Sequence, residues 1–112
     1  MKYKWTDPTR VKSFINLLNE VYGWELVGGH KSKEFFISST VNARGKFYFD
    51  GFDNKRLIFF EFDDLSHTYS PDIRQRDKIK TEALQKVVQS CNRKGMLIRF
   101  DEVKNSLKVI DL

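Results

Sequence analysis

The sequence predicts a single α/β domain over residues 1–112, in which a central mixed β-sheet is flanked by helices. A chain of 112 residues has room for one hydrophobic core. Two helices are signalled by a capping residue followed by proline, at Asp7-Pro8 and at Ser70-Pro71. Between them lie two aromatic strands with apolar side chains on both faces, which is typical of the centre of a covered sheet. The expected order is α-β-β-β-β-α-β-β.

The first helix is expected from Pro8 to about Tyr22. Apolar residues recur there at helical spacing, and Gly23 is a typical residue to end a helix. The apolar positions are Val11, Phe14, Ile15, Leu18, Val21 and Tyr22.

The strands are recognised by β-branched and aromatic residues bounded by turn residues. They are expected at residues 24–27, 34–39, 46–52, 56–62, 96–100 and 107–110. Gly28-Gly29 and a lysine-rich connection separate the first two strands, and residues 41–45 form a loop. No internal repeat, low-complexity segment or linker divides the chain.

The second helix is expected from Pro71 to about Lys94, with Gly95 closing it. At 100° per residue, one broad face is charged in its first turns and apolar in its later turns. That face comprises Ile73, Arg76, Asp77, Lys80, Ala83, Leu84, Val87 and Cys91. The charged turns are therefore expected to overhang the edge of the sheet.

The chain is basic, which favours a polyanionic partner. Twenty Lys and Arg residues against fifteen Asp and Glu give a net charge of +5. Cys91 is the only cysteine, so no internal disulfide can form, and one Cys with two His is too few for a structural zinc site. The longest apolar run, Leu57 to Phe60, is far shorter than a membrane span. We therefore expect a soluble, cytoplasmic protein with no membrane partner.

The most informative chemistry lies at the end of the second aromatic strand. Strand alternation puts Glu61 and Asp63 on the same face as Leu57 and Phe59, so two carboxylates project together. Magnesium takes oxygen ligands, usually one or two carboxylates with waters and phosphate oxygens. This pattern predicts a site for Mg²⁺ or Mn²⁺. The alternative for such an acidic cluster is a solvated strand end.

A third carboxylate, Asp50, joins this site only if the connection between the aromatic strands is wide. A tight two-residue turn at Asp53-Asn54 would set Asp50 opposite Leu57. The distance to Glu61 would then be roughly 13 Å along the strand. With a wider loop, Asp50 stands opposite Glu61 and their β-carbons come within about 5 Å. The metal site therefore requires the wider loop.

The second helix and the segment before it supply further candidates. Arg76, Asp77 and Lys80 would lie beside the acidic strand end, where they could bind phosphate, orient a base or stabilise a leaving oxygen. His67 follows Glu61 by six residues (67 − 61 = 6) and could act as a general base. The alternatives are that the helix turns only project beyond the core and that His67 is a hydrogen-bonding loop residue.

Several short strings together resemble a family of nucleases. They are Phe49-Asp50-Gly51-Phe52, Glu61-Phe62-Asp63-Asp64-Leu65-Ser66-His67, Arg74-Gln75-Arg76-Asp77 and Leu97-Ile98-Arg99. Over about residues 45–103 this combination resembles nuclease domains related to the very-short-patch repair endonuclease, within the PD-(D/E)XK superfamily. Those domains pair an E-x-D-D-x-x-H string with R-Q-x-R-D and a closing L-L/I-R strand. The resemblance implies a restriction-endonuclease-like fold.

The resemblance also implies metal-assisted hydrolysis of phosphodiester bonds. Asp50 would be a metal ligand together with Glu61 or Asp63. His67 would lie near the attacking water, and Asp77 matches the acidic residue of the helix motif.

Two positions depart from the superfamily pattern. The usual Glu-x-Lys is Glu61-Phe62-Asp63 here, so the role of the lysine falls to His67, to Lys80 or to no residue. Many relatives carry a glutamate early in the first helix, where this chain offers only Glu20 near the helix end.

Three functional classes stay open: an active DNA endonuclease, a catalytically silent nuclease-fold module that binds nucleic acid, and a small phage-type interaction or inhibitor protein. An exposed apolar patch without salt-dependent DNA binding would indicate the third class. The residues expected to bind nucleic acid are Arg74, Arg76, Lys78 and Lys80. A homodimer or an associated DNA-reading partner is expected where both strands are cut.

Overall fold

The computed structural model describes residues 8–28, 35–38, 46–63 and 71–112. Within these ranges, two helices and seven strands form one compact α/β domain. They are α1 (Pro8–Tyr22), β1 (Val27–Gly28), β2 (Phe35–Ser38), β3 (Lys46–Phe49), β4 (Gly51–Asp53), β5 (Ile58–Asp63), α3 (Pro71–Ser90), β6 (Met96–Asp101) and β7 (Ser106–Asp111). The predicted fold class and order are confirmed, except that the strand expected over residues 46–52 is divided in two and the strand expected over residues 24–27 lies at Val27–Gly28.

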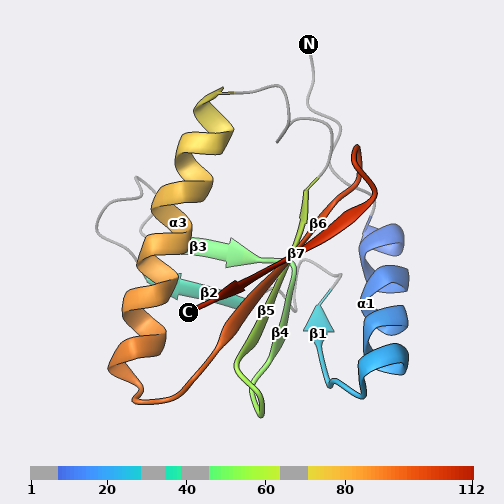
Figure 1. Ribbon diagram of the computed structural model, residues 1–112, viewed down its shortest axis with the longest axis horizontal. Coiled ribbons are helices and arrows are strands. Elements are labelled where there is room, and N and C mark those ends of the chain that lie inside the picture. Colours follow the sequence, from blue (N-terminus) through green and yellow to red (C-terminus); the bar gives the residue numbers. More distant parts are fainter. Residues whose placement is uncertain (1–7, 29–34, 39–45, 64–70) are drawn as a thin grey trace.

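A five-stranded mixed sheet forms the centre of the domain, in the order β1-β4-β5-β6-β7. β4 is antiparallel to both β1 and β5, and β6 is antiparallel to β7. β5 and β6 are parallel because α3 carries the chain back between them. The sheet lies between α1 on one face and α3 on the other (Figure 1).

β5 is the most buried strand of this sheet, with all six residues inside the protein. Phe60 points toward α1 and packs in the cluster that α1 forms with the sheet. Phe59 points toward α3 and packs against Leu84. Because side chains alternate along a strand, Glu61 and Asp63 continue the side of Phe59. The fold therefore carries two carboxylates into the layer beneath α3.

The first aromatic strand is not continuous over residues 46–52, as the sequence pattern had suggested. It bends at Asp50, so β3 pairs with β2 in a separate two-stranded sheet while β4 pairs with β5. Phe47 and Phe49 leave the central sheet and pack into the cluster beneath α3. β1 approaches this bend closely, because a Cβ on Gly28 would lie 2.0 Å from the carbonyl oxygen of Asp50. Only glycine fits there.

Both helices end at residues with left-handed backbone. Gly23 has a φ of +70° and its N–H donates to the carbonyl of Asn19 at 2.9 Å, which confirms the predicted end of α1. α3 ends at Ser90 instead of near Lys94, because Asn92 already adopts a φ of 58°. Neither described helix has the length and hydropathy that a bilayer span requires.

Candidate active site

The connection between β4 and β5 is the wide loop that the predicted site requires. Residues 54–57 form the turn. The register pairs Gly51 with Phe60, Phe52 with Phe59 and Asp53 with Ile58. One step further, Asp50 stands opposite Glu61. The Oδ2 atom of Asp50 also accepts a hydrogen bond from the backbone N–H of Phe62 at 2.7 Å, which holds this side chain against β5.

Glu61 is buried and bound to a cation from α3. Its side chain is about 7% exposed, and its Oε1 atom lies 2.6 Å from Nζ of Lys80, whose side chain is also largely buried at 14%. The Lys80 ammonium also lies 4.4 Å from the ring centroid of Phe49. The ring face attracts the ammonium and keeps it close to Glu61. Lys80, predicted to meet nucleic acid at the helix surface, therefore points inward.

Burial raises the pKa of Glu61 from its ordinary value of 4.5 to about 7. The opposing charge of Lys80 acts in the other direction, as does Arg99 to a smaller extent, whereas the negative charge of Asp50 raises the pKa further. This effect of Asp50 is consistent with its place opposite Glu61 in the register of β4 and β5. Near neutral pH, the Glu61 carboxyl is therefore partly protonated.

A second cluster of charges surrounds Asp63, which lies two residues after Glu61 on β5. Arg99 on β6 donates two hydrogen bonds to Asp63, from Nε to Oδ2 at 2.7 Å and from Nη2 to Oδ1 at 2.6 Å. Its Nη2 atom also donates to Oδ2 of Asp77 on α3 at 2.9 Å. Burial by itself would lower the pKa of Arg99, but the hydrogen bonds and charges of both aspartates outweigh burial and raise the pKa above its usual range. Arg99 stays charged and ties α3 to the sheet.

The donor chemistry of the site suits a hard divalent cation held by two carboxylates. Asp50 and Glu61 face one another in the register of β4 and β5, and two neighbouring carboxylates are oxygen ligands of the kind that Mg²⁺ takes. In the ranges the structure describes, no group of three or more Asp, Glu, His or Cys side chains is arranged to hold a metal. Asp63, which was the other predicted ligand, is engaged by Arg99.

The remaining predicted residues are dispersed. Arg74 and Lys78 line an open groove of about 570 Å³ that extends from Asp63 and Arg99 along β7. Arg76 is exposed on the same helix and does not line this groove. His67 lies in the segment 64–70, outside the described residues.

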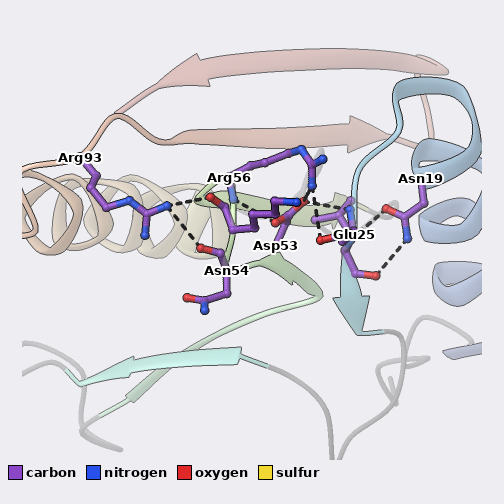
Figure 2. Close-up of polar contacts among 8 residues, drawn as sticks. Asn19, Glu25, Asp53, Asn54, Arg56 and Arg93 are labelled. Atoms are coloured by element: carbon purple, nitrogen blue, oxygen red, sulfur yellow. Dashed lines mark hydrogen bonds and ion pairs between the residues drawn. The ribbon is translucent and has the colours of Figure 1, made fainter.

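Two important charged residues were not assigned a site role by the sequence reasoning. Arg99 shares the strand face of Leu97, so a cation in a buried strand was the signal that could have found it. Asp53 is fully buried and accepts hydrogen bonds from the backbone N–H groups of Glu25 at 2.9 Å and Arg56 at 3.0 Å, and from Nη1 of Arg56 at 3.1 Å (Figure 2). It closes the turn at the opposite end of the β4–β5 pair from Glu61.

Comparison with family models, curated proteins and solved structures gives no significant match for this chain.

Proposed function

We propose that this protein is a metal-dependent nuclease of the PD-(D/E)XK kind, which hydrolyses phosphodiester bonds in DNA. Asp50 and Glu61 hold Mg²⁺ or Mn²⁺, and Lys80 takes the part of the lysine in the Glu-x-Lys pattern of that superfamily. His67 and Asp77 complete the proposed set, with His67 near the attacking water and Asp77 positioning Arg99.

The observation that carries this proposal is the placement of Asp50 opposite Glu61, with the Lys80 ammonium bound to Glu61. Asp50 precedes β4, Glu61 lies on β5 and Lys80 lies on α3, and the Lys80 ammonium touches the Glu61 carboxylate at 2.6 Å. Charge interaction between Asp50 and Glu61 accompanies this contact. Two facing acids beside a buried ammonium provide metal ligands and a positive charge for the phosphate in one place.

The chemistry that a divalent ion supplies when bound is polarisation of a phosphate oxygen and activation of water. Asp50 and Glu61 contribute the negative charge that attracts the ion. Lys80 would supply a positive charge for the phosphate, since its ammonium lies 2.6 Å from Oε1 of Glu61. Arg99 holds Asp63 and Asp77 together, so it keeps α3, and with it Lys80, at a constant distance from β5.

The test is digestion of plasmid, linear duplex and single-stranded DNA in magnesium and in EDTA. Asp50→Asn and Glu61→Gln should each reduce magnesium-dependent cleavage by at least about 100-fold. Loss of a charged ligand lowers the affinity for the ion more than loss of a residue that only hydrogen-bonds to a ligand. Asparagine can still accept the hydrogen bond from Phe62, so Asp50→Asn should remain folded.

The matched controls are Glu20→Gln and Asp111→Asn, which make the same acid-to-amide changes at exposed positions. They should cleave at the wild-type rate, and thermal melts should show that all four variants fold. Wild-type cleavage by Asp50→Asn and Glu61→Gln would rule out the metal site.

A second candidate is a catalytically silent module that binds nucleic acid. It is favoured by the ion pairs themselves, because Lys80 and Arg99 already neutralise Glu61 and Asp63. Titration calorimetry with Mg²⁺ and Mn²⁺ separates the two candidates. The silent module would bind neither ion and cleave no DNA, yet it would bind DNA with a steep dependence on salt.

We place this activity in the cytoplasm, since the single cysteine, Cys91, is an exposed free thiol that suits a reducing compartment. A nuclease domain of this size often acts on both strands of a duplex as a dimer or together with a DNA-reading protein. A second copy of the chain or an associated DNA-reading protein is therefore the partner that we propose besides the nucleic acid.

A further inference from the structure

An open groove of about 570 Å³ is lined by residues of α3 and of the β6–β7 hairpin. Arg74 and Lys78 line it from α3, and Lys104 and Lys108 line it from the hairpin. Lys108 pairs with Arg99 across β6 and β7, so it lies on the face of the sheet that α3 covers. The groove thus has cations on both walls.

These four cations differ from Arg99 in their pairing. Arg99 is neutralised by Asp63 and Asp77 at the inner end of the groove. Within the part of the chain that the structure describes, none of the four other cations forms an ion pair, and all four are exposed. Apart from the Arg99 cluster, the acids of the lining are Glu82 and Asp101.

Asp101 is also engaged in local structure. Its Oδ1 atom accepts hydrogen bonds from the backbone N–H groups of Val103 and Lys104, both at 3.0 Å, and so stabilises the turn of the hairpin. The Lys104 side chain is therefore presented from a turn that Asp101 holds in shape. An anion that enters the groove would therefore meet four cations that form no ion pair within the described residues. Two of them come from α3 and two from the hairpin.

The spacing and chemistry of the lining suit a linear polyanion. Arg74 and Lys78 are four residues apart, so their side chains lie on one side of α3, about 6 Å apart along its axis. Lys104 and Lys108 face them from the other wall. The described lining contains no aromatic ring on which a base could stack. A ligand held here would be recognised through its phosphates, in a hollow between two walls that a single flexible strand enters more readily than a rigid duplex.

We propose that this groove binds the sugar–phosphate backbone of one nucleic-acid strand. The inference rests on the proposed nuclease function in that it names the substrate of the same site. Arg99 lines the groove and is the β6 partner of Glu61, so the groove lies one strand away from Glu61, which does not itself line it. The proposed binding surface therefore keeps Arg74 and Lys78 of the predicted set. It includes Lys104 and Lys108 in place of Arg76 and Lys80.

The test is fluorescence anisotropy with short labelled single strands of DNA and RNA and with a labelled DNA duplex, at several salt concentrations in calcium. Lys78→Ala and Lys108→Ala should each weaken single-strand binding several-fold. Each should also flatten the log–log salt slope by roughly 0.7, which is the expected change for one lost phosphate contact on a single strand. DNA and RNA strands should respond alike, since they share the phosphates.

Lys86→Ala is the matched control, because it removes an exposed cation from the same helix outside the groove. It should leave affinity and slope unchanged, and thermal melts should show that all variants fold. Binding by Lys78→Ala and Lys108→Ala that equals binding by Lys86→Ala would overturn the proposal. A loss confined to the duplex would overturn the assignment to a single strand.

Failure of this inference and failure of the nuclease proposal give different results. Glu61→Gln should keep strand binding while it loses cleavage, because Glu61 does not line the groove. If no variant or metal condition yields cleavage but the groove variants lose binding, the groove inference stands without the nuclease. If DNA is cleaved and the groove variants bind normally, the groove inference is wrong and the nuclease stands.

Discussion

Two buried carboxylates lie at opposite ends of the β4–β5 pair, and the groups that surround them differ in charge and in hydrogen bonding. Asp53, beside the turn, receives two backbone N–H groups and the guanidinium of Arg56 (Figure 2). Glu61, at the far end, is bound by Lys80 and faces the negative charge of Asp50. Both side chains are almost inaccessible to solvent.

The consequence is visible in the pKa values. Burial would raise the pKa of Asp53, but the hydrogen bonds from Glu25 and Arg56 and the charge of Arg56 outweigh burial and lower the pKa below 3.8. For Glu61, burial prevails and the pKa rises to about 7. A buried acid with satisfied oxygens supports the fold, whereas a buried acid opposite another acid is kept at a cost in stability. That cost is understandable where a bound cation is needed.

The largest expected effect on stability is that of Asp53→Ala. It leaves two backbone donors and Arg56 without their acceptor, and we expect the free energy of unfolding to fall by about 4 kcal/mol. Urea denaturation at pH 7 would measure it. Asp111→Ala removes an exposed aspartate and should change stability little. If the Asp53 variant folds, its cleavage per folded molecule should match wild type, and a selective loss of cleavage would contradict the division of roles between Asp53 and Glu61.

A somewhat smaller effect is expected from Glu61→Gln, with a dependence on pH. Because the folded-state pKa of about 7 exceeds the ordinary value of 4.5, the native protein binds the Glu61 proton more tightly than the unfolded chain does. This contribution is fully present below pH 4.5 and is lost as pH rises through 7. Relative to Glu61→Gln, the wild type should therefore lose on the order of 3 kcal/mol between pH 4.5 and pH 8.

Urea denaturation of both proteins at a series of pH values would test this difference. Glu20→Gln is the control, since Glu20 is exposed on α1 and should follow the wild-type profile. Parallel profiles for wild type and Glu61→Gln would show that Glu61 titrates normally in the folded protein.

The smallest expected effect is that of Arg56→Ala. The Arg56 side chain is 34% exposed, and Asp53 would keep both backbone donors, so only about 1 kcal/mol should be lost at pH 7. The loss should shrink as the pH falls through the depressed pKa of Asp53, because a protonated Asp53 needs no cation. A loss as large as that of Asp53→Ala would mean that the cation, and not the backbone donors, stabilises Asp53.

Much of the fold could be predicted because local signals agree with the tertiary structure. Helix α1 begins at the Asp7-Pro8 signal and ends before Gly23, and β5 falls in the strand predicted from its two apolar faces. The bend at Asp50 could not be predicted. Phe47 and Phe49 fit the pleat of a central strand equally well, and only the space beneath α3 favours their removal to a second sheet.

The candidate site was predicted in part. The sequence left two positions for Asp50, opposite Leu57 or opposite Glu61, and the four-residue turn at 54–57 selects the second. The partner of Glu61 was also open, because a lysine near the start of a helix can point outward or inward. The contact of Lys80 with Phe49 and Glu61 settles its direction.

The sequence by itself determined the two helices and the central strand β5, and that Glu61 and Asp63 share a strand face. Capping residues, helical spacing and strand alternation are properties of neighbouring residues, so they can be read along the chain. The tertiary structure decided which charges meet. Lys80 with Glu61, Arg99 with Asp63 and Asp77, and the facing walls of the groove each depend on how α3 is rotated over the sheet and where β6 and β7 lie. Packing of the whole core determines those positions, because the interacting residues are far apart in sequence.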